Sequence, residues 1–465
     1  MRIEHDMLGE RSIGDHFYYG IHTLRALENF NITGRPIHME LVKALVYIKK
    51  AAALTNTNIG LLEGRIAEAI VNACDEVLLG RLTEQFVVDS MQGGAGTSAN
   101  MNVNEVIANR AIELLGGKKG DYSLVHPLDH VNMSQSTNDV FPTAVRIAAI
   151  KMLIPLSELF AELQTALQEK EEEFASVLKV GRTQLQDAVP VTLGQEFGAW
   201  AQAISRDRWR IYKVEERLRQ VNLGGTAVGT GLNAEKKYVF LVIEKLRELT
   251  GLGLARSEYM MDPTQNNDVF VEVAGLLKTS AVNLSKIASD LRLLASGPRA
   301  GIGEIKLPPV QAGSSIMPGK VNPVIPEAIN QIAFQVMGND LTITMAAQAG
   351  QLELNAFLPV IAHNLFEMLD LLRNGLEVFI NKCIKGIKAD QARCRQLVEE
   401  SYTLVTALTG HIGYEKAAQL AQKCVEQGKT VREIVIEENL IEEDKLKTIL
   451  NALEMTKPGI PGKRR

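Results

Sequence analysis

The chain has 465 residues, more than one typical folding core contains, so two or three domains are expected. Hydrophobic residues make up 46% and charged residues 23%, close to the average of globular proteins, which excludes a largely disordered chain. The formal net charge of −5 excludes nucleic acid as the main partner, because phosphate binding needs a concentrated basic face.

Membrane and secretory signals are absent from the sequence. No apolar run approaches the roughly 20 residues that cross a bilayer. The segment from Met1 to Asp6 lacks the apolar core of a signal peptide, which favours a cytoplasmic protein. The four cysteines form no C-x-x-C pair, which indicates reduced thiols rather than a disulfide framework or a zinc site.

The N-terminal part combines an arm and two helices. Residues 1 to about 35 are mixed in character and rich in turn residues, so we expect an irregular arm packed on the body. Apolar residues then recur at helical spacing and predict helices over 39–58 and 62–79.

A first polar loop covers residues 92–102, where small and polar residues crowd together before a helical pattern resumes. Glycines just ahead of a helix leave its first N–H groups free to hold an anion. The alternative is a plain capping turn, with Thr97 or Ser98 as the N-cap residue. The glycines Gly93, Gly94 and Gly96 lack the strand and spacing of a dinucleotide-binding fingerprint.

A second polar loop covers residues 129–139 and precedes a helical pattern over 140–178, with a break expected near Pro155. Capping could explain one or two of its polar side chains, but not so dense a run. His126 and His130 stand close by, and we favour a loop-shaping role over metal binding for them because Pro127 disfavours a helix with both rings on one face. Six residues of the loop carry a hydroxyl or a neutral amide: Asn132, Ser134, Gln135, Ser136, Thr137 and Asn138.

A third polar loop, 181–190, precedes a helix predicted over 193–221, and a short helix follows over 236–249. The clearest helical pattern of the chain lies at 273–294, where apolar residues alternate steps of three and four. Such a narrow seam suits long, nearly parallel helices, either within one chain or between copies of it, and it favours a homo-oligomer.

The fourth polar loop is Gly-Ser-Ser-Ile-Met-Pro-Gly-Lys-Val-Asn-Pro at 313–323. Glycine lets backbone approach a ligand closely, and proline fixes φ, so this segment predicts an ordered loop rather than a helix or strand. An ordinary surface turn is the alternative, but Ile, Met and Val between the polar groups favour a loop folded over a pocket.

Further helices are expected over about 326–347 and 359–387, and the sequence near 390 becomes more charged, with short helices and turns. Few segments alternate with period two. The fold class is therefore mainly α, with a small C-terminal domain after the long helices.

The four loops predict a site for a carboxylate, built from neutral donors and the ammonium of Lys320. They contain no paired Asp/Glu motif, no cluster of metal ligands and no Ser/His/Asp signature. The missing base could be a serine, if backbone amides and a nearby ammonium stabilise its deprotonated form.

The sequence at 313–323 resembles the signature of the fumarase/aspartase superfamily, whose members eliminate ammonia, water or an amine, mostly to give fumarate. The likeness extends over nearly the whole chain. Gly-Gly-Ala-Gly-Thr-Ser at 93–98, Val-Ile-Pro-Glu at 324–327 and the start of the chain through Gly20 resemble the aspartase branch. Gln184 stands where fumarases and some aspartases have histidine and other aspartases have glutamine.

The resemblance implies three domains, at 1–137, 138–392 and 393–465. It further implies a central bundle of long helices that assembles into a multi-helix core in a homotetramer, with three subunits contributing to each site. The implied reaction is reversible deamination of L-aspartate to fumarate and ammonia. No cofactor is required by this hypothesis, and activation by Mg²⁺ is left open.

The resemblance also implies roles for single residues. Ser314 would be the general base that takes a proton from C3 of L-aspartate. The β-carboxylate and its enediolate would be held by Thr97, Ser136, Thr137 and Ser315. The α-carboxylate would be held by Lys320 and Asn322 with help from Thr183, and Asn138 and Gln184 would lie near the departing amine.

Two positions depart from the family pattern. Leu358 precedes Pro359 where aspartases commonly have an acid, and Thr409-Gly410 stands where the family commonly has Asn-Pro. Glu327 is either a helix-start acid or a group that supports the site indirectly. Two alternatives to an aspartase stay open: a class II fumarase and a non-catalytic helical scaffold.

Overall fold

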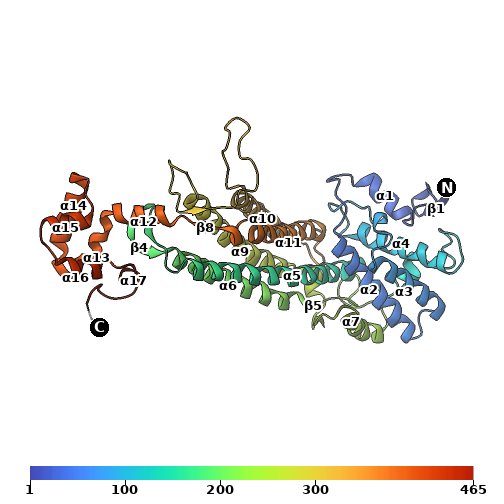
Figure 1. Ribbon diagram of the computed structural model, residues 1–465. Coiled ribbons are helices and arrows are strands. Elements are labelled where there is room, and N and C mark those ends of the chain that lie inside the picture. The colour runs from blue at the N-terminus through green and yellow to red at the C-terminus, as the bar shows by residue number, and fades with distance from the viewer. Residues whose placement is uncertain (464–465) are drawn as a thin grey trace. The chain divides into compact units, whose positions relative to one another are not determined.

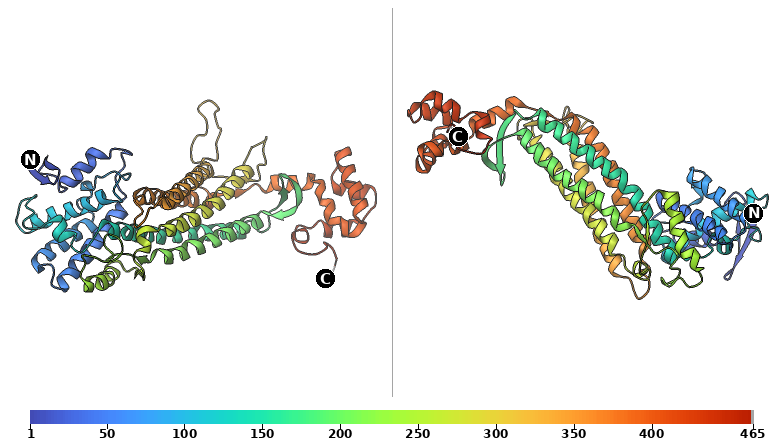
Figure 2. Two further views of the ribbon diagram at one scale, coloured as in Figure 1. Left: turned by 180° about the vertical axis from the view of Figure 1, so that it is seen from behind. Right: turned by 90° about the horizontal axis from the view of Figure 1, so that it is seen from below.

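The computed structural model describes residues 1–463, apart from the side chain of residue 453. The chain divides into two compact units: residues 1–158, 209–281 and 334–373 form the first, and residues 159–208, 282–333 and 374–465 form the second. Five long helices each begin in one unit and end in the other (Figures 1 and 2): α5 (Thr137–Glu173), α6 (Leu193–Leu218), α9 (Asp268–Leu294), α10 (Val324–Gln348) and α11 (Leu358–Lys382).

The helical predictions are confirmed for most of the chain. α2 covers Met39–Asn58 as expected, and α3 (Gly64–Leu78) and α7 (Lys236–Thr250) differ from their predicted bounds by one or two residues. Among the described residues, sheet is limited to pairs of strands. The prediction of a mainly α fold is therefore confirmed.

The first unit surrounds α4 (Thr97–Leu114), whose sides are nearly all buried. α1 (Ile21–Asn29) and α3 pack on α4, and α2 packs between α3 and α7. The asparagines Asn100, Asn102, Asn104 and Asn109 of α4 are buried with its apolar residues. Because buried amides need partners, this helix carries polar contacts inside the core.

The second unit ends in a bundle of short helices. Its core is apolar, and Thr430 and Glu433 form a reciprocal capping box at the start of α15. The helices are α12 (Gln391–Glu400), α13 (Val405–Ile412), α14 (Tyr414–Gln427), α15 (Val431–Glu437), α16 (Glu443–Ile449) and α17 (Ala452–Met455).

The remaining short elements are turns and two-residue strands. Strands β5 and β6 pair in parallel, and β7 and β8 pair antiparallel. Their bounds are Gln220–Val221 (β5), Ala255–Arg256 (β6), Ile305–Lys306 (β7) and Lys388–Ala389 (β8); helical turns occur at Thr83–Gln85 (η1), Pro127–Val131 (η2), Asp262–Gln265 (α8), Ile384–Gly386 (η3) and Tyr402–Leu404 (η4).

The prediction of an irregular N-terminal arm was wrong. β1 (Arg2–Asp6) and β2 (Gly9–Ile13) form an antiparallel hairpin, and α1 follows it. Only Glu4 and Ile13 of the two strands are buried. Since neither strand presents a full apolar face, the sequence lacks the period-two alternation that would have revealed them.

The polar loop at 181–190 also belongs to a hairpin, of β3 (Leu178–Thr183) and β4 (Gln186–Thr192). The register shifts between Val180 and Arg182, so Gly181 lies at an irregularity of the ladder. Glycine and proline within the strands concealed them from the sequence pattern.

The long helices are confirmed, but α5, α6 and α11 end at Glu173, Leu218 and Lys382, before the predicted 178, 221 and 387. α5 runs without interruption through Pro142 and Pro155, so the expected break is not observed. Proline costs about 3 kcal/mol in a helix interior, and the fully buried Leu156 and Phe160 supply packing that offsets it. The seam of α9 is buried within the chain, which makes it intrachain core. No helix in the described part of the chain is both long and apolar enough to span a membrane.

Candidate active site

The first polar loop places Thr97 at the start of α4. Gly94, Ala95 and Gly96 all have positive φ, at 88°, 55° and 95°, and the Thr97 hydroxyl donates to the Gly94 carbonyl at 2.8 Å. A Cβ on Gly96 would lie 2.4 Å from the ring of Phe141, so glycine is required there. Thr97 itself is exposed.

This loop does cap α4, but not through Thr97 or Ser98. Gly96 is the N-cap residue of α4, and the helical N–H of Ala99 is bound by the side-chain oxygen of Gln92 at 3.0 Å. The hydroxyl of Thr97 accepts no hydrogen bond from the helix in the described part of the chain. The exposed hydroxyl can therefore meet a ligand by giving up its bond to the Gly94 carbonyl.

The second polar loop leads into α5, where capping does explain part of the pattern. Ser136 Oγ accepts from the N–H of Asn138, and Asp139 Oδ1 accepts from the N–H of Ser136. The other oxygen of Asp139 accepts from the N–H groups of Gly224 and Thr226, at 3.0 and 2.9 Å. Asp139 is fully buried, and burial raises its pKa to about 6.

A buried lysine that sequence reasoning missed lies beneath this loop. Lys49 of α2 is fully buried and donates to Asn132 Oδ1 and Gln135 Oε1, both at 2.9 Å. Burial lowers the pKa of Lys49 to about 7. A signal was available, because Lys49 lies four residues after the apolar Leu45 and so on the buried face of the helix.

Asparagine side chains connect Lys49 to the residues predicted to bind substrate. Asn100 Nδ2 donates to Asn132 Oδ1 and to Thr137 Oγ1, at 3.2 Å in each case. Asn138 Nδ2 donates to the Ala227 carbonyl at 2.8 Å. The starts of α4 and α5 thus share one hydrogen-bonded network within the first unit.

A cavity of about 660 Å³ opens on this network. Asn132, Ser134, Gln135 and Ser136 line one part of it, and the segment 226–235 lines another. Its size suits a small polar molecule together with water.

His126 and His130 shape the adjoining turn, as predicted. His126 Nδ1 accepts from the N–H groups of Leu128 and Asp129, and His130 Nδ1 accepts from the N–H of His126. Over the described residues, no group of three potential metal-ligating side chains is found.

The third loop is the tip of the β3–β4 hairpin in the second unit. Gln184 and Leu185 both have positive φ, at 54° and 63°, although neither is glycine. Such a conformation costs energy for a non-glycine residue, and residues held in this way often serve a site. Thr183 pairs with Gln186 directly below the tip.

Buried charges anchor this hairpin. Glu304 is fully buried and pairs with Lys179 at 3.1 Å and with Arg182 at 2.9 Å. Lys179 also pairs with Glu196 at 2.6 Å. The carboxylate of Glu304 therefore fixes the strand that ends at Thr183.

The fourth loop leads into α10 and projects from the helices as an open segment (Figure 1). The N–H of Gly313 donates to the Lys320 carbonyl at 2.8 Å, and Asn322 Nδ2 donates to the Gly313 carbonyl at 2.7 Å. These bonds close the two ends of the loop on each other.

Ser314 lies inside this closed turn. Its Oγ accepts from the N–H groups of Ile316 and Met317, at 3.2 and 2.9 Å. Two N–H groups aimed at one hydroxyl oxygen favour negative charge on that oxygen. Lys320 is exposed, and it forms no ion pair with any residue that the structure describes.

The predicted site residues thus fall into three groups. Thr97, Ser136, Thr137 and Asn138 surround the starts of α4 and α5; Thr183 and Gln184 form the hairpin tip; and Ser314, Ser315, Lys320 and Asn322 share one loop. No hydrogen bond or ion pair within residues 1–463 joins one group to another.

The structure also shows the environments of Leu358, Glu327 and His411. Leu358 is 1% exposed at the start of α11, so it serves packing. Glu327 is exposed in the first turn of α10. His411 Nε2 lies 2.7 Å from the Pro461 carbonyl.

Comparison with known proteins decides the family. A family model described as "Lyase" matches residues 9–338, more than half of the chain, and one described as "Fumarase C C-terminus" matches residues 404–457. The chain belongs to the fumarase/aspartase superfamily.

Curated members of this superfamily match over the full length. The aspartate ammonia-lyase of Bacillus subtilis (strain 168) is 52% identical over 99% of this chain and 97% of its own length. The aspartate ammonia-lyase of Helicobacter pylori (strain ATCC 700392 / 26695) is 47% identical over 98% of both chains.

Solved structures of the superfamily share the fold. A fumarate lyase:delta crystallin from Brucella melitensis superposes with a TM-score of 0.95, at 50% identity over 98% of this chain and 100% of the other. A class II fumarase from Schistosoma mansoni gives a TM-score of 0.93, at 37% identity over 98% of this chain and 99% of the other.

Proposed function

We propose that this chain is an aspartate ammonia-lyase, which converts L-aspartate reversibly to fumarate and ammonia. The observation that carries the proposal is full-length identity of about 50% to several proteins named for that activity. Class II fumarase is the weaker alternative, because the fumarase structure that matches is only 37% identical.

The chemistry begins at Ser314. Its deprotonated oxygen removes a proton from C3 of L-aspartate, and the electron pair left on C3 delocalises into the adjacent β-carboxylate to give an enediolate. Anti elimination then forms the C2–C3 double bond as the C2–N bond breaks, and ammonia leaves. The two N–H groups at Ser314 Oγ support this role because they stabilise the deprotonated oxygen before the reaction.

The enediolate carries two negative charges, so it needs several preorganised donors. Thr97, Ser136, Thr137 and Ser315 would bind the β-carboxylate as it becomes the enediolate. The hydrogen bond from Asn100 to Thr137 supports this assignment, since it holds the Thr137 oxygen in place.

The other end of the substrate needs a cation and a site for the amine. Lys320 and Asn322, with Thr183, would bind the α-carboxylate, and Asn138 and Gln184 would lie near the departing amine. The exposed ammonium of Lys320 supports its part, because a lysine with no carboxylate partner among the described residues is available to an anionic ligand.

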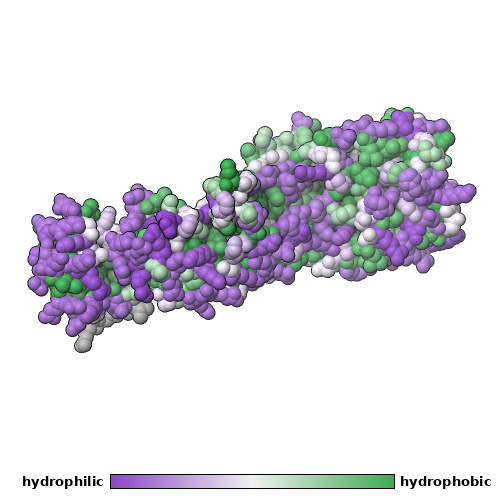
Figure 3. All heavy atoms as spheres, turned by 45° about the horizontal axis from the view of Figure 1, so that its top comes forward, coloured by the Kyte–Doolittle hydropathy of each residue, from purple (hydrophilic) through white to green (hydrophobic). Residues whose placement is uncertain are grey.

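We further propose a homotetramer in which three subunits build each site. α10 exposes a stripe of large apolar side chains at helical spacing: Phe334, Leu341 and Met345 are 63%, 60% and 58% exposed. Figure 3 shows apolar side chains, in green, gathered in patches on one face of the molecule. Exposed apolar surface of this kind marks sites of subunit contact.

The remaining parts of the proposal concern organisation and location. Domains at 1–137, 138–392 and 393–465 are proposed, as is a cytoplasmic location, which the four buried, unbridged cysteines support. The proposed reaction steps require no cofactor; activation by Mg²⁺ is a separate question for assay.

The test is a comparison of substrates. Purified protein is mixed with L-aspartate or L-malate while fumarate absorbance is followed. We expect fumarate from aspartate at a kcat/KM at least about a hundredfold above that for malate. Turnover of malate alone would establish a fumarase, and turnover of neither would favour a non-catalytic scaffold.

A further inference from the structure

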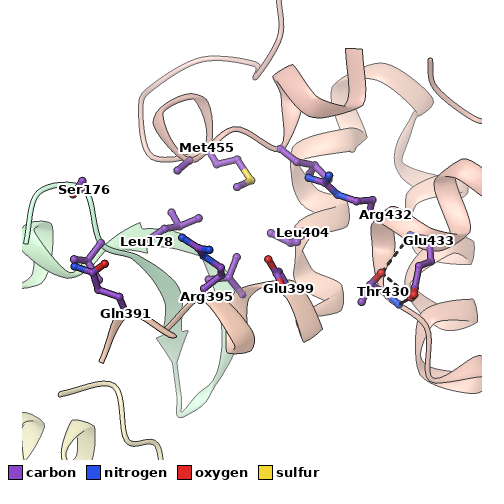
Figure 4. Close-up of a pocket in the computed structure, with 14 residues that line it drawn as sticks. Ser176, Leu178, Gln391, Arg395, Glu399, Leu404, Thr430, Arg432, Glu433 and Met455 are labelled. Carbon is purple, nitrogen blue, oxygen red and sulfur yellow. Dashed lines mark hydrogen bonds between the residues drawn. The ribbon is translucent and has the colours of Figure 1, made fainter. Parts of the chain in front are cut away.

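A separate cavity of about 590 Å³ lies in the second unit (Figure 4). The first residues of β3, the helix α12 and the segment from α15 to α17 form its walls. None of its lining residues belongs to the proposed active site. Its volume falls in the range of sites for small molecules.

Charged groups without partners face this cavity. Arg395 and Arg432 enter from opposite sides, from α12 and α15, and the carboxylate of Glu399 lies between them (Figure 4). In residues 1–463 none of these three side chains has a hydrogen bond or an ion pair. All three side chains are exposed, so each can turn toward a charged ligand without breaking a bond within the protein.

The fourth charged group is already engaged. Glu433 Oε2 accepts from both the N–H and the hydroxyl of Thr430, at 2.8 Å each. These bonds lower the pKa of Glu433, and the bond from the Thr430 N–H has the larger effect. The cavity therefore offers two guanidinium groups and one carboxylate.

Apolar residues form another part of the wall, beside the polar Ser176, Gln391 and Thr430. Leu178, Leu404 and Met455 are placed around the three charged groups (Figure 4). Leu178 and Met455 pack on the apolar core of the small C-terminal helices, and Leu404 is part of it. A ligand in this cavity meets charged groups of both signs with apolar side chains beside them.

We propose that this cavity binds a zwitterionic α-amino acid with an apolar side chain. The guanidinium groups of Arg395 and Arg432 bind its carboxylate, and Glu399 binds its ammonium. The side chain packs against Leu178, Leu404 and Met455. A simple carboxylate fits less well, because Glu399 would repel it, and a simple amine would leave both arginines unpaired.

Isothermal titration of the full-length protein with L-leucine tests the proposal. Fumarate is present at saturation to occupy the proposed active site. We expect one leucine per chain, and at least about tenfold weaker binding of 4-methylpentanoate, which lacks the ammonium, and of 3-methylbutylamine, which lacks the carboxylate. Arg395→Gln and Glu399→Gln should each weaken leucine binding by about tenfold.

Lys445→Gln is the matched control, since it removes an exposed cation of α16 that does not line the cavity. All three substituted side chains are exposed, and circular dichroism verifies that the variants fold. No saturable binding of leucine would overturn the proposal, as would equal binding by all variants. So would tighter binding of 4-methylpentanoate than of leucine.

Discussion

In the proposed mechanism Ser314 is a weak acid that the backbone of its own turn prepares to act as a base. Its oxygen receives two N–H groups from its own turn, and the turn is closed by Asn322 and by the backbone of Lys320. No histidine or carboxylate within residues 1–463 is hydrogen-bonded to it. Backbone dipoles are fixed before the substrate arrives, so they stabilise charge without reorganisation.

Replacement of this residue gives the first prediction. Ser314→Ala should lower kcat by about 10²- to 10⁴-fold, because the proposed base is lost. The melting temperature should stay unchanged, since the loop is largely exposed. Initial rates with L-aspartate measure the effect, with Ser123→Ala, an exposed serine of another loop, as control. A variant with full activity would remove Ser314 as the base.

Lys49 gives a prediction about pH. Its pKa is about 7 in the folded chain and about 10.4 when exposed, so between these values the unfolded chain binds more protons and stability rises with pH. Relative to Lys49→Met, the natural protein should therefore gain stability from pH 7 to pH 10.

Urea unfolding at several pH values and one protomer concentration measures this difference. Lys50→Met serves as control, because the neighbouring Lys50 is paired with Asp75. A difference between the natural protein and Lys49→Met that does not change with pH would show that the Lys49 ammonium is not perturbed by burial.

At the scale of elements, the β3–β4 hairpin depends on a buried charge. Glu304 has no exposed surface and binds both Lys179 and Arg182. Loss of one partner from a buried ion pair leaves uncompensated charge in the interior. The hairpin tip holds Gln184 and Leu185 in a conformation that costs energy, so it relies on this anchor.

Glu304→Gln should destabilise the protein by about 3 kcal/mol and lower kcat/KM for L-aspartate, because the anchor of Thr183 and Gln184 weakens. Glu216→Gln removes an exposed pair with Lys213 and should change stability by less than about 0.5 kcal/mol. Thermal melts and initial rates compare the two. Equal effects would contradict the role of Glu304 as an anchor.

The sequence predicted helices far better than hairpins, and the reason is physical. α2 and α9 each bury a continuous apolar face, which leaves a helical period in the sequence. The hairpins bury few residues and contain glycine or proline, so they leave no such pattern. Pro155 led to the wrong prediction of a helix break. The helix α5 continues through it because packing around α5 outweighs the local cost of the proline.

The polar loops of the candidate site could be predicted from their unusual composition. The contacts between distant residues that support them could not. Dense hydroxyls and amides indicated the loops at 92–102, 129–139 and 313–323. Nothing in the local sequence showed that Asn100 would meet Thr137, or that Glu304 would hold Arg182, since these pairs are 37 and 122 residues apart. Such contacts exist only in the folded chain.

At the scale of the whole molecule, the proposed mechanism requires an assembly of several chains. The apolar stripe on α10 supports a subunit interface. Leu341→Asp should therefore dissociate the assembly and abolish activity, because a buried charge at an interface has no partner. Size-exclusion chromatography and initial rates measure this, with Leu79→Asp, on a residue 79% exposed at the end of α3, as control.

The most direct test mixes two inactive variants. Ser314→Ala and Thr137→Ala are each purified, dissociated in mild denaturant, combined in equal amounts and reassembled. If one site takes Ser314 and Thr137 from different subunits, random mixing should restore about a quarter of the natural activity. Activity that stays at the level of the separate variants would contradict a site shared between subunits.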